Sequence, residues 1–238
     1  MTDQLAPTSP HPDALFHRQQ GIYNPVEHPN DKAVFVGVGG IGSFAAFATA
    51  KLGVPNLTII DPDVINVHNA PNQLHALAAT GRTKVEALAS LIEAHMGSHV
   101  TVNQFNTKHD GVDYDQFQGV VVSGLDSMEA RKALWEERIK NNITIPLYID
   151  ARIAGQLILI YACCPYLPDE IEHYEKTLHS DADAEPAPCT ERGVIDVGFQ
   201  CGALITRMLR KHFAGEEVHH ITNMSMNSLM LLKGDWIK

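Results

Sequence analysis

The chain has 238 residues, of which 45% are hydrophobic, so it can bury a substantial core in one large domain or two small ones. Its 18 Lys and Arg residues against 28 Asp and Glu residues give a net charge of -10, which argues against nucleic acid and anionic membranes as partners. The longest apolar run, 157–164, is far shorter than the roughly 20 residues of a membrane-spanning helix. The start MTDQLAPTSPHPD lacks the basic and apolar regions of a secretion signal, so we expect a cytoplasmic protein without a membrane segment.

Strand and helix patterns alternate through the first half of the chain. Residues 1–14 are polar and proline-rich, which predicts a flexible lead-in. AVFVGV at 33–38 is a continuous apolar run, typical of a strand that is buried on both faces. The next elements are predicted as a helix at 43–52, a strand at 56–60, a helix from 80 to 96 and a strand at 100–105.

The same alternation continues in the second half. QLILIYACC at 156–164 follows the preceding strand too closely for a helical crossover, so we expect it to pair antiparallel to a neighbour. The other predicted elements are strands at 119–123 and 146–150, a helix at 127–140, a long exposed crossover loop at about 165–192, a helix at 197–213 and short strands to the C-terminus.

This order of elements predicts the fold class. Alternating strands and helices indicate an α/β protein with a doubly wound, mostly parallel, Rossmann-like sheet that carries helices on both faces. The pattern around 156–164 adds some antiparallel strands near the C-terminal half. Residues 15–238 are predicted to form a single domain.

A glycine-rich turn follows the first predicted strand. Gly37-x-Gly39-x-x-Gly42, with Gly40 inside it, stands between a strand and a helix, where glycines allow a tight turn and close approach of the backbone to phosphates. Asp61 ends the second predicted strand, where a carboxylate can bind a ribose hydroxyl. In this context nucleotide binding is favoured over a purely structural turn, and the motif alone indicates NAD or FAD.

The residues after Asp61 indicate a different nucleotide. The segment Asp61-Pro-Asp63-Val-Ile-Asn-Val-His-Asn69-Ala-Pro-Asn-Gln73 resembles the D-x-D-x-V-x-x-x-N-x-x-R-Q signature of the ThiF/MoeB and ubiquitin-activating-enzyme superfamily. Four further segments resemble motifs of that family in the same order, namely Phe16–Gln19, Gly81–Val85, Gly124–Asp126 with Arg131, and Cys189–Val194. The resemblance spans residues 15 to 213, so it implies that 15–238 is a single ThiF-like ATP-binding domain.

The resemblance implies a reaction. Enzymes of this family bind ATP and Mg²⁺ and adenylylate the C-terminal carboxylate of a small ubiquitin-like or sulfur-carrier protein or a peptide, giving acyl-AMP and pyrophosphate. The resemblance assigns Lys84 to the phosphates, Asp126 to Mg²⁺, and Asn69 and Gln73 to the nucleotide pocket. The residues alone also allow an exposed helix lysine, an N-cap at Asp126 and turn-forming amides. Asp63 is either a nucleotide contact or part of a D-P-D turn.

Two further catalytic candidates come from the resemblance. Arg18 matches an arginine that reaches the ATP phosphates from the other subunit, which implies a homodimer or a heterodimer of the family's kind. Cys189 matches a cysteine that in some members bonds covalently to the activated carrier and in others is structural. Its neighbours act in opposite directions, because Arg192 would lower the pKa of its thiol and the acidic stretch SDADAE at 180–185 would raise it.

Three departures from the family pattern limit the prediction. Asn72 replaces the family's arginine before Gln73, which removes a cation near the γ-phosphate unless Arg82 supplies one. The four cysteines form no C-x-x-C pair, so we expect no structural zinc, and the chain has no room for the extra domains of eukaryotic activating enzymes. A catalytically impaired nucleotide-binding scaffold and, less favoured, an NAD(P)-dependent oxidoreductase stay open as alternatives.

Overall fold

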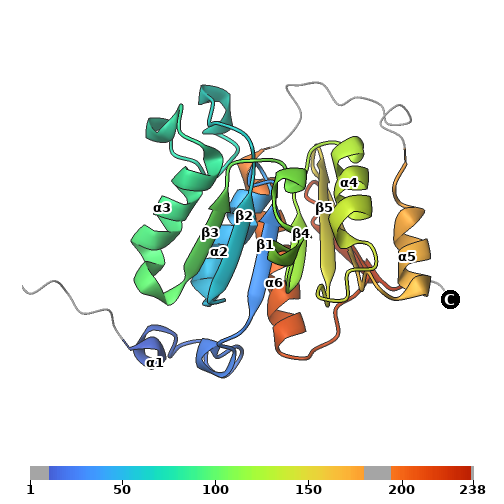
Figure 1. Cartoon of the computed structure of the whole chain (residues 1–238), viewed down its shortest axis with the longest axis horizontal. Coiled ribbons are helices and arrows are strands. Elements are labelled where there is room, and N and C mark those ends of the chain that lie inside the picture. Colours follow the sequence, from blue (N-terminus) through green and yellow to red (C-terminus); the bar gives the residue numbers. More distant parts are fainter. Residues whose placement is uncertain (1–10, 180–193, 237–238) are drawn as a thin grey trace, which may run out of the picture.

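A single eight-stranded sheet forms the centre of the computed structural model, which describes residues 11–179 and 194–236 (Figure 1). The strand order is β3-β2-β1-β4-β5-β6-β7-β8. The first five strands in this order are parallel to one another, and β6, β7 and β8 each pair antiparallel with the strand before them. The predicted mostly parallel sheet with antiparallel strands towards the C-terminus is therefore confirmed. The strands are β1 Lys32–Val36, β2 Asn56–Ile60, β3 Thr101–Phe105, β4 Val120–Ser123, β5 Tyr148–Ala154, β6 Leu157–Cys163, β7 Ile221–Ser225 and β8 Met230–Gly234.

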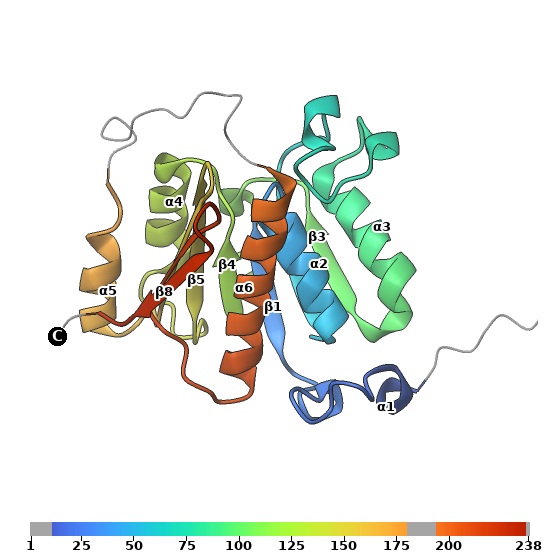
Figure 2. The same ribbon diagram turned by 180° about the vertical axis from the view of Figure 1, so that it is seen from behind.

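Helices cover both faces of the sheet, as predicted. α2, α3 and α6 lie on one face, and α4 and α5 lie on the other (Figures 1 and 2). None of the helices in the described parts of the chain is long and apolar enough to cross a bilayer. The helices are α1 Pro12–Leu15, α2 Gly42–Leu52, α3 Lys84–Met96, α4 Met128–Leu134, α5 Pro168–Glu175 and α6 Ile195–Phe213, and a π-helical turn, Trp135–Ile139, extends α4.

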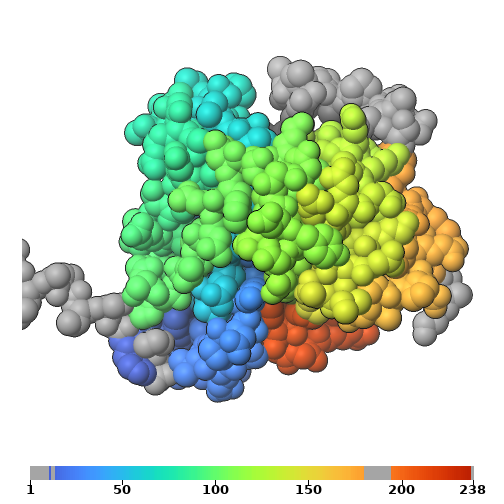
Figure 3. All heavy atoms as spheres, viewed as in Figure 1, coloured from blue at the N-terminus to red at the C-terminus, as the bar shows by residue number. Residues whose placement is uncertain are grey.

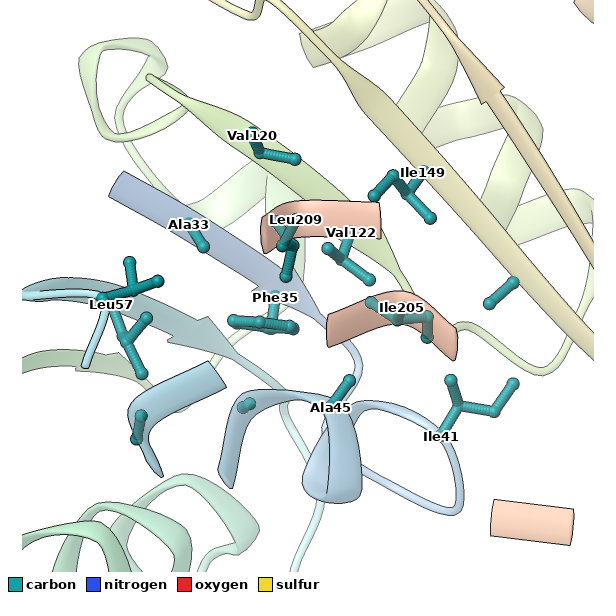
Figure 4. Close-up of a cluster of buried hydrophobic side chains, with 14 of the residues drawn as sticks. Ala33, Phe35, Ile41, Ala45, Leu57, Val120, Val122, Ile149, Ile205 and Leu209 are labelled. Carbon is teal, nitrogen blue, oxygen red and sulfur yellow. The ribbon is translucent and has the colours of Figure 1, made fainter. Parts of the chain in front are cut away.

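The core has two layers because successive strand side chains point to opposite faces of the sheet. In β1, Phe35 packs into the layer beneath α2, α3 and α6, and Val34 packs into the layer beneath α4 and α5. Figure 4 shows Phe35 beside Leu57 of β2 and Ile205 of α6. Each such fully buried side chain contributes on the order of 1.5–3 kcal/mol, so the apolar strand runs dictate which elements become central.

Two glycines allow α6 to pack directly against α2. A Cβ atom at Gly202 would lie 2.7 Å from Cβ of Phe44, and one at Gly198 would lie 2.6 Å from Cε2 of the same ring and 2.9 Å from the carbonyl oxygen of Gly40. Because residues four apart share one face of a helix, both glycines face α2. The start of α6 is thereby brought against the glycine-rich turn.

Two expected boundaries were wrong. The helix expected from Thr80 begins at Lys84, because Gly81 has a left-handed φ of +90° and Thr83 caps α3 by accepting a hydrogen bond from the amide of Glu86. The stretch 165–192 was expected to be a loop, but α5 lies within it and begins with Pro168, since proline is well tolerated in the first turn of a helix. Residues 1–10 of the lead-in expected at 1–14 lie outside the described residues, and α1 begins at Pro12 within its remainder. The single domain at 15–238 stays a prediction.

The α2–α6 contact predicts a cost for adding one methyl group. Gly202→Ala should lower the free energy of unfolding by about 1–3 kcal/mol, because the new Cβ would overlap the buried Phe44 side chain and its backbone. Urea unfolding followed by circular dichroism measures this loss. Gly21→Ala is the matched control, since nothing lies within 4 Å of its Cβ position. Equal stability of the two variants would show that the helices do not pack as closely as described.

Candidate functional site

The glycine-rich turn connects β1 to α2 at the carboxyl edge of the parallel strands. Gly37 has a left-handed φ of +83°, and a Cβ at Gly42 would lie 1.9 Å from the carbonyl oxygen of Gly37, so larger residues do not fit at either position. A Cβ at Gly37 would also lie 2.9 Å from the carbonyl oxygen of Gly124, which follows β4. The turn thus sits between β1 and β4, where the strand order reverses and α/β sheets usually bind ligands.

The backbone of this turn offers unpaired donors. Among the described residues, the N–H groups of Gly39, Gly40 and Ile41 donate to no backbone or side-chain acceptor. They precede the N-terminus of α2, where the helix dipole also favours negative charge. The turn is therefore suited to an anion such as a phosphate chain.

The carboxylate of Asp61 fixes this turn through hydrogen bonds to backbone amides. It is 5% exposed, and one carboxylate oxygen accepts a hydrogen bond from the amide of Val38 at 2.8 Å while the other accepts from the amide of Asp63 at 2.9 Å. Burial raises the pKa of Asp61, and the nearby ammonium of Lys84 opposes this shift. The carboxylate joins two loops of the site, and its predicted contact with a ribose stays a prediction.

Lys84 is not an exposed helix residue. The first residue of α3, it is 7% exposed, and its Nζ lies 2.7 Å from Oδ2 of Asp63 and 3.9 Å from Oδ1 of Asp61. Asp63 itself is largely exposed and also accepts a backbone hydrogen bond from Lys84. The structure therefore brings Lys84 and both acidic residues of the D-P-D segment together beside the glycine turn.

The segment after β2 lies along the glycine turn, in the part of the molecule that stands at the top of Figure 3. A Cβ at Gly39 would lie 3.6 Å from Nε2 of Gln73, and one at Gly40 would lie 3.6 Å from the carbonyl oxygen of Asn72. The side-chain oxygens of Asn72 and Gln73 are buried and find no hydrogen-bond partner in the described structure. Unpaired buried amide oxygens are costly, so these two amides indicate a ligand that supplies donors.

Asn69 and Arg82 behave differently from these amides. The side-chain oxygen of Asn69 accepts a hydrogen bond from the amide of Asn66 at 2.8 Å, so Asn69 stabilises a short 3-10 turn, and its place in the nucleotide pocket stays a prediction. The guanidinium of Arg82 donates to Oγ of Ser90 at 3.1 Å along α3. Arg82 is thus already engaged in this structure and is not turned towards the position of the cation that Asn72 lacks.

Asp126 follows β4 and is exposed. The cap of α4 is Ser127, whose hydroxyl accepts from the amide of Ala130 at 3.2 Å, so the alternative role of Asp126 as an N-cap is wrong. Its carboxylate makes no hydrogen bond or ion pair with any residue that the structure describes. A free carboxylate at this edge is available to a metal ion.

A buried network beneath Asp126 was not predicted. Arg131, from the family-like D-x-x-x-x-R segment, donates to the carbonyl oxygen of Leu125 and to the carboxylate of Asp150. Asp150 is fully buried and also accepts from Nε of Arg152 at 2.8 Å. The guanidinium of Arg131 therefore fixes the carbonyl group that precedes Asp126. The sequence held two signals for this network, the arginine of the D-x-x-x-x-R segment and the acidic end of the apolar run PLYID, but no local pattern pairs them.

Arg18 lies far from these residues within one chain. It is exposed, and its neighbour Gln19 donates from Nε2 to the carbonyl oxygen of Leu52 at 2.6 Å, at the C-terminus of α2. The glycine turn lies at the other end of α2, a helix about 16 Å long at 1.5 Å per residue. Figure 1 shows this N-terminal segment at the opposite end of the molecule from the segment that follows β2. The structure does not bring Arg18 to the other site residues of the same chain.

Two of the cysteines, Cys189 and Cys201, bear on the prediction of a reactive thiol. Cys189 lies outside the described residues, so its catalytic role stays a prediction. Cys201 in α6 is fully buried, and burial raises the pKa of its thiol to about 12, so it is an unreactive part of the core. Among the described residues, no three His, Cys, Asp or Glu side chains gather as a metal site.

A buried histidine completes the layer behind the glycine turn. His75 is 4% exposed, and its Nε2 lies 2.9 Å from the carbonyl oxygen of Val38. Burial lowers the pKa of His75, and the positive charge of Lys84 acts in the same direction. A single histidine among thirteen gives no sequence signal for such a role.

The fold defines an α/β protein with a doubly wound, mostly parallel sheet and a glycine-rich turn at its switch point. The ThiF family matches residues 29–234, so the chain belongs to the ThiF family. It is 24% identical over 235 residues to ubiquitin-like modifier-activating enzyme 5 of Rattus norvegicus, covering 88% of this chain and 57% of that protein. It is 34% identical over 126 residues to tRNA threonylcarbamoyladenosine dehydratase of Escherichia coli, covering 51% of this chain and 46% of that protein. The chain thus spans about half the length of these relatives.

Solved structures share the fold. MccB of E. coli with ATP superposes with a TM-score of 0.67 at 18% identity, covering 92% of this chain and 69% of MccB. PaaA superposes with a TM-score of 0.74 at 16% identity, covering all of this chain and 78% of PaaA. At these identities the likeness establishes the arrangement of the sheet and helices.

One buried histidine, His75, and one partly buried histidine, His212, predict a dependence of stability on pH. Burial lowers the pKa of His75 and of His212 below the usual 6.5, so unfolding takes up protons in this range. Their contribution is therefore complete above pH 6.5 and is lost as the pH falls towards their folded-state pKa values. We expect the difference in unfolding free energy between the wild type and the double variant His75→Gln, His212→Gln to shrink from pH 7.5 to pH 5.5.

Urea titrations of both proteins at several pH values measure this difference. The comparison cancels the opposite effect of Asp31 and Asp61, whose raised pKa values favour proton uptake in the folded state. A difference that is constant over this range would contradict the assignment of neutral, buried histidines.

Proposed function

We propose that the protein adenylylates the C-terminal carboxylate of a small ubiquitin-like or sulfur-carrier protein, or of a peptide, with ATP and Mg²⁺. The observation that carries this proposal is a glycine turn with free N–H groups that is contacted by the backbone of Asn72 and the side chain of Gln73, two residues whose buried amide oxygens have no partner in the described structure. Membership of the ThiF family supports it. So do the structures of MccB with ATP and with MccA, and the relatives named as ubiquitin-like modifier-activating enzymes.

The residues of the site fit a nucleoside triphosphate. The N–H groups of Gly39 and Gly40 would donate to phosphate oxygens at the start of α2. An amide side chain both donates and accepts, so Asn72 and Gln73 can pair with the hydroxyl or amino groups of a nucleoside as well as with phosphate. Mg²⁺, held by the phosphates and by Asp126, would neutralise charge on the leaving pyrophosphate.

The reaction joins two anions, so its barrier is largely electrostatic. An oxygen of the substrate carboxylate bonds to the α-phosphorus, and the bond from that phosphorus to the bridging oxygen breaks, with its electron pair leaving on pyrophosphate. The chain's own residues align the two reactants and neutralise the charge on the phosphates. Nζ of Lys84 lies 2.7 Å from Oδ2 of Asp63, and because Asp63 is exposed, the lysine side chain can exchange this partner for a phosphate oxygen of the nucleotide. Arg131 steadies the backbone before Asp126.

A second candidate, an impaired nucleotide-binding scaffold, is favoured by one observation. Asn72 replaces a family cation, and the guanidinium of Arg82 is bound to Ser90 instead of facing the site. ATP–pyrophosphate exchange in the presence of candidate carriers separates the two, because only the enzyme catalyses exchange. The net charge of -10 makes a tRNA substrate a weaker candidate than a protein or peptide.

The assembly is part of the proposal. We propose a cytoplasmic homodimer in which the partner subunit's Arg18 reaches the ATP phosphates, since Arg18 of the same chain lies at the far end of α2. Such an arginine stabilises charge in the transition state, as an arginine finger does.

The first functional prediction concerns the metal. Asp126→Ala should reduce ATP–pyrophosphate exchange on the order of 100-fold or more, because charge neutralisation is lost in the transition state. Asp113→Ala is a suitable control, since Asp113 is also exposed and precedes a 3-10 turn on the amino side of β4, whereas Asp126 follows the carboxyl end of that strand. Exchange that persists in Asp126→Ala with unchanged dependence on Mg²⁺ would remove Asp126 from the metal site.

The second concerns the subunit boundary. Arg18→Ala and Asp126→Ala should each be inactive, whereas an equal mixture should recover about a quarter of the wild-type exchange, because half of the dimers are mixed and one site in each is complete. Native mass spectrometry establishes that subunits have exchanged. An exchanged mixture without activity would show that Arg18 does not act across the dimer.

A further inference from the structure

The backbone of Val38 is held on both sides by buried side chains. Its amide donates to Oδ2 of Asp61 at 2.8 Å, and its carbonyl oxygen lies 2.9 Å from Nε2 of His75. Val38 is fully buried, and the two side chains are 5% and 4% exposed. Two consecutive peptide planes at the centre of the glycine turn are therefore fixed without contact with solvent.

The planarity of the peptide links His75 to a donor of the site. The carbonyl of Val38 and the N–H of Gly39 belong to one peptide plane, which is trans like all others described, and they point in opposite directions. A donor that holds the carbonyl oxygen thus sets the direction of the Gly39 N–H. That N–H donates to no described residue.

The segment that carries His75 is fastened to the turn at a second point. The hydroxyl of Ser43 donates to the carbonyl oxygen of Gly39 at 2.6 Å and accepts from the amide of Leu74 at 3.2 Å. Gln73, next along this segment, faces Gly39 as described above. Residues 73–75 therefore contact the turn with an amide, a backbone N–H and an imidazole in succession.

The protonation of His75 suits this contact. The charged groups that face it are Lys84 and Asp61, and burial lowers the pKa of His75, so the ring is neutral at pH 7. A neutral imidazole with its proton on Nε2 donates to the carbonyl oxygen of Val38, and an apolar residue in its place would leave that buried oxygen unpaired.

We propose that His75 is a positioning residue that directs the Gly39 N–H towards the phosphates of ATP through its hydrogen bond to Val38. This inference rests on the proposed function, because it assigns the glycine turn to a nucleoside triphosphate. The inference predicts that His75 affects binding of the phosphates of the nucleotide and does not affect binding of the nucleoside.

Calorimetric titration of the full chain with MgATP and, separately, with adenosine tests this inference. His75→Leu should weaken MgATP binding about tenfold, the effect of one lost hydrogen bond to the phosphates, and should leave adenosine binding unchanged. His75→Gln retains an N–H donor, should recover much of the MgATP affinity, and serves as the working variant if the leucine variant does not fold. His109→Leu is the control, because His109 is also buried but pairs with Glu137 away from the turn.

The outcomes are distinct. Selective loss of MgATP affinity in His75→Leu, partly restored in His75→Gln and absent in His109→Leu, supports the inference. Equal losses for MgATP and adenosine, or no loss at all, overturn it and leave the proposed function in place. Failure of the wild type to bind MgATP overturns the proposed function, and the inference with it.

Discussion

The burial of the Asp61 carboxylate is the constraint on which the site depends. A charged group removed from water is costly unless hydrogen bonds and an opposite charge compensate it. Here the amides of Val38 and Asp63 supply the hydrogen bonds and Lys84 supplies the charge. Satisfying this one carboxylate therefore requires the glycine turn, the D-P-D segment and the start of α3 to meet. The same requirement leaves the outer N–H groups of the turn free for a ligand.

A second buried carboxylate has the corresponding role on the other side of the turn. Asp150 binds two guanidinium groups, and through Arg131 it fixes the backbone that precedes Asp126. The exposed carboxylate of Asp126 thus follows a backbone that is held rigidly, which is what the proposed role in stabilising charge requires. Asp126 itself makes no hydrogen bond or ion pair with the part of the chain that the structure describes, so the fold does not use this carboxylate for its own stability.

Much of the sheet could be predicted from the sequence, and less of the site. The run at 56–60 matches β2 residue for residue, because a strand buried on both faces is largely apolar, as Leu57, Ile59 and Ile60 are here. Local signals failed where one pattern has two meanings, as when Pro168 begins α5 in a stretch expected to be a loop. The motifs identified Lys84 and Asp126, but the direction of Arg82 and the contact of His75 with Val38 depend on tertiary packing, which no local pattern encodes.

The central claim is that this glycine turn serves ATP and not a dinucleotide. Calorimetric titration of the wild-type protein with ATP in the presence and absence of Mg²⁺, and with NAD⁺ in the same buffer, tests it most directly. The account predicts saturable binding of ATP that strengthens with Mg²⁺, and no binding of NAD⁺. Binding of NAD⁺ without binding of ATP would contradict it.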